Sequence, residues 1–89
     1  MQSQALTIVN RLGLHARAAA KFVSLASQFN SEITLVRNDR QVNGKSIMGI
    51  MMLATGRGAN VELRVDGDDE DEAMQALCEL IASGFGEDG

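Results

Sequence analysis

The residues best suited to chemistry lie close together near the start of the chain, at Gly13, His15, Arg17 and Lys21. His15 is the only histidine among 89 residues. An imidazole titrates near neutral pH, so a neutral, nucleophilic form is available there. Arginine and lysine are the side chains that bind phosphate oxygens best. The cluster therefore predicts a site at which a phosphoryl group is accepted and held.

The positive charges of Arg17 and Lys21, close after His15, support this interpretation. Gly13 permits a tight turn and helical spacing follows it, so His15 is expected at or beside a helix N-cap. A helix start is partially positive and ordinarily attracts acids, as residues 69–72 illustrate in the last predicted helix. Arg17 and Lys21 break that rule, which favours an external anion at the free amides. The alternative is that His15 is merely a cap or a surface residue.

A second segment of interest runs from Gly44 to Leu53 and holds three of the five methionines. Ser46 has the right chemistry to cap a short helix over 47–53. So short a helix cannot bury every apolar side chain, and flexible methionines suit a surface that meets several partners. The alternative is that all of them belong to the core. A phosphate on Ser46 would be favoured by the helix start and would alter the adjacent surface.

Composition restricts the class of protein. A chain of 89 residues, 45% hydrophobic and 3% aromatic, predicts a single domain over 1–89 with an aliphatic core. A domain this small cannot also enclose a deep cavity, which favours a carrier or binding protein over an enzyme. One histidine and one cysteine, Cys78, leave no internal disulfide and argue against structural zinc. We expect Cys78 to be a buried, inert thiol, and we expect no metal and no cofactor.

Charge and hydropathy point to a protein of the cytoplasm. The net charge of −4 argues against nucleic acid as a partner, although a small basic site could still bind one phosphate. Residues 1–31 contain no acid, whereas residues 65–89 contain nine acids and no lysine or arginine. We find no secretory signal and no stretch long enough to span a membrane, so no membrane partner is expected.

Hydrophobic periodicity predicts seven elements. Strands are expected over 4–10, 32–37, 40–42 and 60–65, helices over 16–29 and 47–53, and a last helix that Asp68 caps and Gly84 ends. A glycine-rich loop is expected over 55–58. Each strand has one apolar face and each long helix one apolar stripe. The order β-α-β-β-α-β-α therefore predicts an α+β fold, with helices on one side of a mostly antiparallel sheet.

Two motifs resemble those of a known family. Leu12-Gly13-Leu14-His15-Ala16-Arg17 is similar to the active-site motif of HPr, the phosphocarrier of the bacterial phosphoenolpyruvate-dependent phosphotransferase system. Gly44-Lys45-Ser46-Ile47-Met48 resembles the segment around the regulatory serine of that family. Element order and chain length also match. The resemblance implies an open-faced β-sandwich, with four antiparallel strands and three helices on one face of the sheet.

The resemblance also implies a function. His15 would be phosphorylated on ring Nδ1 by enzyme I and would pass the group to an enzyme IIA domain, with Arg17 stabilising the phosphate. Ser46 would be the regulatory site, open to an HPr kinase/phosphorylase where a cell has one. The protein would be a monomeric carrier and not an enzyme. The expected phosphate- and partner-binding residues are Gly13, Leu14, Ala16, Ala18, Lys21, Ile47, Met48 and Met51.

One position departs from the family pattern, because Ala18 stands where proline is usual. Ala18-Ala19-Ala20-Lys21, together with Ser83-Gly84-Phe85 and the acidic tail, resembles the nitrogen-related paralogue NPr. That paralogue would deliver phosphate to a regulatory enzyme IIA. The alternatives are a sugar-branch HPr, a binding module that acts through Ser46 and the methionine-rich helix, and a small-ligand domain of similar layout.

Overall fold

The computed structural model describes residues 1–53 and 56–87, so Thr55 of the predicted glycine-rich loop and Asp88 of the acidic tail lie outside the described residues. The predicted element order is confirmed, and a short 3-10 helix follows the last α-helix. The elements are β1 (Gln2–Thr7), α1 (Ala16–Ala26), β2 (Glu32–Arg37), β3 (Arg40–Asn43), α2 (Ile47–Met52), β4 (Asn60–Asp66), α3 (Glu70–Ala82) and η1 (Gly84–Gly86).

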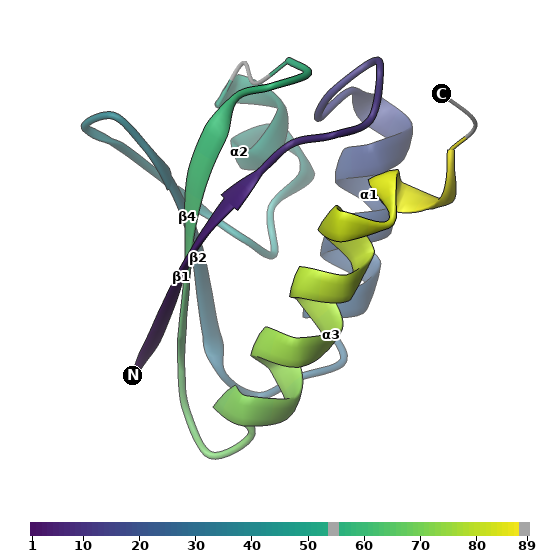
Figure 1. Cartoon of the computed structure of the whole chain (residues 1–89). Helices are drawn as coiled ribbons and strands as arrows, with labels where there is room; N and C mark the ends of the chain where they lie inside the picture. The colour runs from purple at the N-terminus through teal and green to yellow at the C-terminus, as the bar shows by residue number, and fades with distance from the viewer. Residues whose placement is uncertain (54–55, 88–89) are drawn as a thin grey trace.

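The four strands form one antiparallel sheet in the order β1-β4-β2-β3. The three helices cover one face of this sheet and leave the other face open (Figure 1). The predicted open-faced sandwich is therefore confirmed. Among the described residues, no helix has the length and apolarity needed to cross a membrane.

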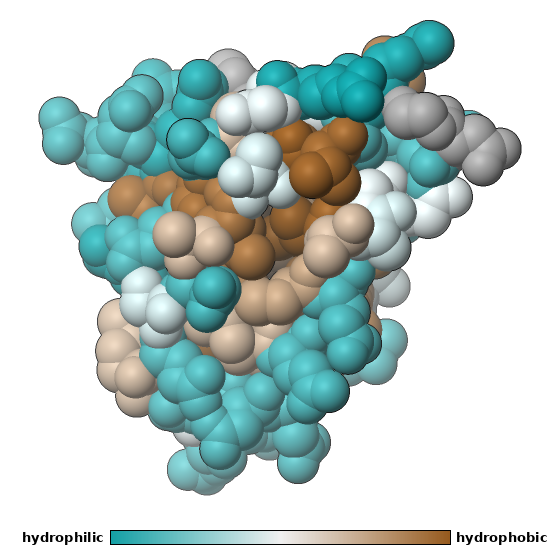
Figure 2. Space-filling model, in the orientation of Figure 1, coloured by the Kyte–Doolittle hydropathy of each residue, from teal (hydrophilic) through white to brown (hydrophobic). Residues whose placement is uncertain are grey.

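Strand β4 shows how the sequence pattern selects the two faces. Val61, Leu63 and Val65 are buried, while Glu62 and Arg64 between them are not. Side chains alternate along a strand, so the three apolar residues all face the helices. On the open face, the Arg64 guanidinium donates hydrogen bonds to the Glu62 carboxylate at 3.2 Å. Figure 2 shows apolar surface in the upper middle of one face of the molecule, with hydrophilic side chains around it.

Helix α1 is shorter than its apolar pattern, which predicts a helix over 16–29. Its buried face consists of Ala18, Ala19, Phe22 and Ala26. After Ala26 the amides of Gln28 and Phe29 bond to carbonyls three residues back, at 3.1 and 3.2 Å. This tighter spacing is that of a 3-10 turn, which ends the α-helix and leaves Phe29 only partly buried.

Strand β1 is displaced from its predicted range of 4–10. It ends at Thr7, and the next residue, Ile8, bonds to the connection before β4. The Ile8 amide donates to the Ala59 carbonyl at 2.9 Å, and the Ile8 carbonyl accepts the Gly58 amide at 2.7 Å. The Ile8 side chain is fully buried. The chain therefore leaves the sheet early and crosses its end toward α1.

The predicted cap of the last helix was also wrong. Asp69, and not Asp68, occupies the N-cap position of α3, and it makes no side-chain cap to its own helix. Its carboxylate accepts the Asn30 amide at 2.8 Å, the Ser31 amide at 3.0 Å and the Ser31 hydroxyl at 2.5 Å. Asp69 thus joins the start of α3 to the connection between α1 and β2.

The architecture brings three distant segments to one end of the molecule. The β1–α1 connection, α2 and η1 all lie in the upper part of Figure 1. The packing of α1 against both α2 and η1 holds them there. His15 is on this end, because it directly precedes α1.

Candidate functional site

His15 occupies the N-cap of α1, as the sequence predicts. Gly13, with φ of +64°, makes the turn that leads into the helix, and its amide donates to the Asn10 carbonyl at 3.2 Å. The His15 backbone is extended, and its carbonyl accepts the Ala19 amide at 2.8 Å, the first bond of the helix. The turn and the cap together hold the imidazole at the positive end of α1.

The two ring nitrogens of His15 have different partners. Nδ1 accepts the backbone amide of Arg17 at 3.3 Å, and Nε2 forms a hydrogen bond with the Glu87 carboxylate. A nitrogen that accepts a hydrogen bond carries a lone pair, so these partners assign the ring proton to Nε2. Nδ1 therefore carries the lone pair in this arrangement, and it lies at the helix amides.

Glu87 is the residue of this site that the sequence did not predict, because in sequence it is only one acid of an acidic tail. The Asn10 amide donates to its Oε1 at 3.0 Å and to the Gly13 carbonyl at 2.8 Å. The Lys21 ammonium donates to the Phe85 carbonyl at 2.7 Å. Phe85 was the available signal, because a large aromatic side chain beyond a helix end has to fold back to be buried.

The Glu87 carboxylate is held in its ionised form. The Asn10 hydrogen bond, followed by the His15 hydrogen bond and the charge of Lys21, lowers the pKa of Glu87 below the ordinary range. At neutral pH the site therefore places a negative carboxylate on the Nε2 side of the imidazole.

Around the imidazole the surface is a shallow depression of about 720 Å³. It is lined by Arg11, Leu12, His15, Ala16, Arg17, Lys21, Gly86 and Glu87. Three cations therefore share the site with one carboxylate, and Arg11 is a further addition to the predicted residues. Such an open, cationic hollow suits a phosphoryl group carried by another macromolecule.

The other predicted surface residues divide into buried and exposed groups. Leu14 and Ala18 lie in the core at 5% and 0% exposure, and Gly13 is buried as well, so these residues act through backbone and packing. Ala16 is exposed and lines the depression. The predicted exposure of the methionine-rich helix is confirmed, because large apolar side chains of α2 face solvent at Ile47, Met48, Met51 and Met52.

Ser46 is the N-cap of α2, as predicted. Its hydroxyl accepts the Gly49 amide at 3.1 Å, and its backbone is extended. Helix α2 packs against α1, and Lys45, directly before Ser46, bonds to the Phe29 carbonyl just beyond the C-terminal end of α1.

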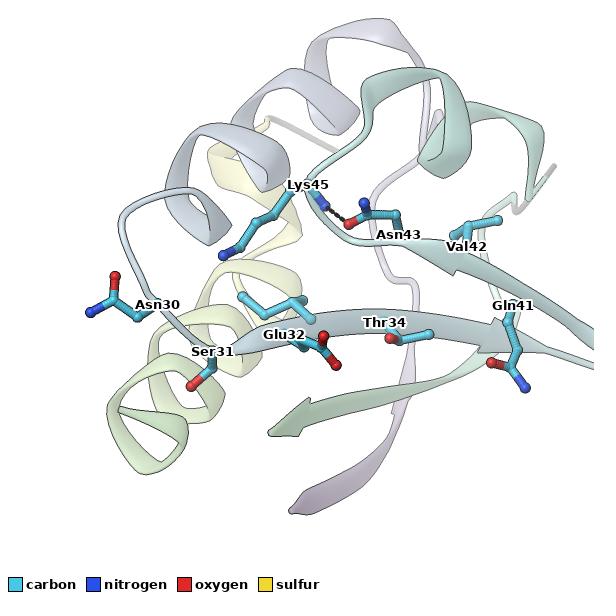
Figure 3. A pocket seen from close by; sticks show the side chains of 9 residues that line it. Asn30, Ser31, Glu32, Thr34, Gln41, Val42, Asn43 and Lys45 are labelled. Atoms are coloured by element: carbon cyan, nitrogen blue, oxygen red, sulfur yellow. Dashed lines mark hydrogen bonds between the residues drawn. The ribbon is translucent and has the colours of Figure 1, made fainter. Parts of the chain in front are cut away.

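A second hollow, of about 440 Å³, lies between β2, β3 and the loops that flank them (Figure 3). Its labelled side chains include Glu32, Thr34, Gln41 and Asn43, and the Lys45 amide donates to the Asn43 carboxamide at 2.8 Å. The Lys45 ammonium is bound to the Phe29 carbonyl at 2.7 Å. The lining contains no histidine or cysteine.

Neither Cys78 nor an acidic cluster forms another site in the part of the chain that the structure describes. Burial raises the pKa of the Cys78 thiol, whose Sγ lies 3.5 Å from the sulfur of Met74. Cys78 is only partly buried, and not fully buried as the sequence predicts. Within 1–53 and 56–87, no group of three or more His, Cys, Asp or Glu could hold a metal ion.

The fold and site define a class of protein, a small open-faced sandwich with a histidine at a helix start beside a cationic surface hollow. The family model described as "PTS HPr component phosphorylation site" matches residues 2–83. The chain belongs to the HPr family, the phosphocarriers of the phosphotransferase system. It is thus a phosphocarrier and not an enzyme.

Individual relatives agree with this assignment. The chain is similar to the phosphocarrier protein HPr of Neisseria meningitidis, at 58% identity over 98% of both chains. It is also similar to the phosphocarrier protein NPr of Shewanella violacea, at 45% identity over 92% of this chain and 90% of that protein.

Solved structures of the family have the same fold. An HPr from Thermoanaerobacter tengcongensis superposes with a TM-score of 0.96 and 49% identity, over the whole of both chains. An HPr dimer from the same organism superposes with a TM-score of 0.78, at 50% identity over 98% of this chain and all of that one.

Proposed function

We propose that His15 accepts a phosphoryl group at Nδ1 from phosphorylated enzyme I and passes it to an enzyme IIA. The observation that carries this proposal is the hydrogen-bonding of the ring. Nδ1 holds a lone pair and lies at the start of α1, where the Arg17 amide reaches it at 3.3 Å. Membership of the HPr family supports the reaction, and the hydrogen bonds of the ring support Nδ1 as the accepting atom.

The transfer is a displacement at phosphorus. The Nδ1 lone pair forms the new N–P bond while the bond to the donor breaks, and the electron pair of that bond leaves with the donor. Charge on the phosphoryl oxygens is stabilised by the helix-start amides and by the guanidinium of Arg17, with Arg11 at the edge of the depression. The Arg17 amide can move from Nδ1 to a phosphoryl oxygen. Transfer to enzyme IIA is the same displacement, with His15 as the donor.

The partner surface in this proposal adjoins the histidine. Leu12, 59% exposed, lies in the same depression, and the exposed residues of α2 lie at the same end of the molecule. An apolar rim around a cationic centre lets a partner exclude water and align its own reactive group. Enzyme I and enzyme IIA would bind this one surface in turn.

The test is phosphorylation by a matched enzyme I with phosphoenolpyruvate. The unmodified chain is expected to gain one acid-labile, base-stable phosphate, and His15→Ala is expected to gain none. Equal labelling of the two proteins would contradict the proposal. Gel mobility or ³¹P NMR would report the product, and NMR would identify the phosphorylated nitrogen.

We further propose that the chain serves the nitrogen-related branch. What supports this is Ala18, which replaces the usual proline, together with the Ser83-Gly84-Phe85 ending. The sugar-branch alternative predicts faster phosphorylation by a sugar-type enzyme I than by its nitrogen-related homologue. Initial rates with both enzymes, measured side by side, would decide between the two branches.

Ser46 is proposed as a regulatory site, because its hydroxyl lies at the start of α2 beside the exposed methionines. In this proposal a phosphate on Ser46 would add charge to the docking surface. Incubation with an HPr kinase/phosphorylase and ATP, with Ser46→Ala as the control, tests the modification. The chain is also proposed to act as a monomer, which sedimentation at working concentration would check.

A further inference from the structure

Residues 84–87 are held against the site in an uncommon conformation. Gly84, Phe85 and Gly86 all have positive φ, of 66°, 59° and 72°. Phenylalanine seldom adopts such a conformation, and it persists only where its surroundings enforce it. Here Phe85 is 1% exposed in the core, and its carbonyl accepts the Lys21 ammonium at 2.7 Å. The buried ring and the lysine together direct the next residues toward His15.

This turn places Glu87 beside the imidazole of His15. One of its carboxylate oxygens forms the hydrogen bond with Nε2 of His15, and the other accepts the Asn10 amide at 3.0 Å. Asn10 is itself 2% exposed and is tied to the Gly13 carbonyl at 2.8 Å. A buried amide, a carboxylate and an imidazole therefore form a chain of hydrogen bonds, in which each group orients the next one.

A carboxylate on one ring nitrogen has two effects on the other. It accepts the proton of Nε2 and so keeps the lone pair on Nδ1. It also stabilises the positive charge that the ring gains when Nδ1 bonds to phosphorus and Nε2 keeps its proton. The same logic applies to carboxylate–histidine pairs in hydrolases, where the carboxylate sets the tautomer and stabilises the imidazolium without taking the proton.

We propose that Glu87 is a positioning residue for phosphoryl transfer, holding His15 as the Nε2–H tautomer and balancing the ring charge while phosphate is bound at Nδ1. The inference rests on the proposed role of His15. Glu87 contacts neither the phosphoryl group nor the nitrogen that accepts it, so it acts through the imidazole. No proton leaves the ring in this step: Nδ1 gains the phosphorus, and Nε2–H remains hydrogen-bonded to Glu87.

The test compares Glu87→Ala and Glu87→Gln in the full chain. Glutamine keeps an acceptor for Nε2–H and removes the charge, whereas alanine removes both. Glu79→Gln is the matched control, because it removes one exposed acid from α3. The ¹⁵N shifts of the His15 ring, recorded where the imidazole is neutral, report the tautomer. Initial rates of phosphorylation by enzyme I report the transfer, and amide NMR spectra confirm that each variant is folded.

Glu87→Ala is expected to raise the fraction of the Nδ1–H tautomer and to slow phosphorylation about tenfold, a loss typical of removing the partner of a functional histidine. Glu87→Gln should restore the tautomer and only part of the rate. Glu79→Gln should change neither. Unchanged ring shifts in folded Glu87→Ala would overturn the inference, whatever the rate does, and so would an unchanged rate.

The two proposals fail in different ways. If the unmodified chain accepts no phosphate, or if His15→Ala accepts it equally well, the proposed function is wrong. If the unmodified chain is phosphorylated on His15 and folded Glu87→Ala matches it in either the rate or the ring shifts, only the role of Glu87 is wrong.

Discussion

His15 combines two roles that are usually separate. Helix N-caps are normally serine, threonine, aspartate or asparagine, whose side-chain oxygens accept a first-turn amide. Here an imidazole nitrogen accepts the Arg17 amide, and that nitrogen is the proposed acceptor of the phosphoryl group. Phosphorylation would therefore replace one cap with a stronger one, because phosphoryl oxygens carry negative charge to the positive helix end.

The first prediction concerns the arginine beside this nitrogen. Arg17→Ala keeps the backbone amide and removes the guanidinium, so the developing charge on the phosphoryl oxygens loses one donor. We expect phosphorylation of His15 to slow about 100-fold, as is usual for the loss of one such donor. Initial rates with enzyme I measure it. Arg64→Ala, on the open face of the sheet, is the control and should retain the rate of the unmodified chain.

At the level of elements, the short helix α2 is held at both ends by side chains. The Ser46 hydroxyl caps its start at 3.1 Å, and the Arg40 guanidinium donates to the Met52 carbonyl at 2.7 Å. Only Ile50 of this helix is buried. A six-residue helix is marginal by itself, so these contacts and packing against α1 keep its exposed methionines in place.

The second prediction separates capping from docking at Ser46. Ser46→Ala removes the cap and should lower the free energy of unfolding by about 1 kcal/mol. Ser46→Asp keeps a capping oxygen, so its stability should stay near that of the unmodified protein. The new charge should nevertheless slow phosphorylation about tenfold, because a partner must desolvate it at an apolar surface. Urea unfolding and enzyme I rates test the two effects, and equal rates for Ser46→Asp and the unmodified chain would contradict the docking role.

The third prediction concerns the junction of α3 with the α1–β2 connection. The Ser31 hydroxyl, followed by the Asn30 amide, lowers the pKa of Asp69 in the folded state. The stabilisation is therefore present above the unfolded pKa of about 3.9 and is lost as the pH falls through the lower folded pKa. Asp69→Asn should remove this pH dependence.

Thermal unfolding between pH 7 and pH 2 measures this effect. The melting temperature of the unmodified chain should fall more steeply below pH 4 than that of Asp69→Asn, which should already be lower at pH 7. Parallel curves for the two proteins would show that the carboxylate does not stabilise the junction.

At the scale of the whole molecule, the sheet order places β4 at the centre, between β1 and β2. Leu63 of β4 is fully buried under the helices and pairs with Leu35 of β2. The core is aliphatic apart from phenylalanines such as Phe22 and Phe85, which agrees with the composition. Because the core fills the space between sheet and helices, the functional groups lie at the end of the sandwich, where loops and helix starts meet.

The fourth prediction uses this contrast between the two faces. Leu63→Ala removes a buried side chain from the central strand and should lower the free energy of unfolding by about 3 kcal/mol. Gln41→Ala, on the exposed side of β3, should change it by less than about 0.5 kcal/mol. Urea denaturation of both variants measures the difference. Similar losses at the two positions would contradict the assignment of the faces.

Local pattern was enough to predict much of this molecule. Alternating and helical spacing of apolar residues identified the strands and helices. Each of these elements buries one face, and the local periodicity indicates which face is buried. The turn at Gly13 and the helical spacing after it predicted His15 at a helix N-cap, and α2 is too short to bury all of its apolar residues. These features depend on neighbours within a few residues along the chain.

The tertiary structure decided the contacts between residues that are far apart in sequence. It bound Asp69 to Ser31 instead of to its own helix. It ended β1 at Thr7, because the backbone of Ile8 forms hydrogen bonds with the connection before β4. It also brought Glu87 to His15 across 72 residues, through the length of α3 and the left-handed turn at Phe85. Hydrophobic periodicity cannot predict such a contact, because the contact depends on where the packed elements end in space.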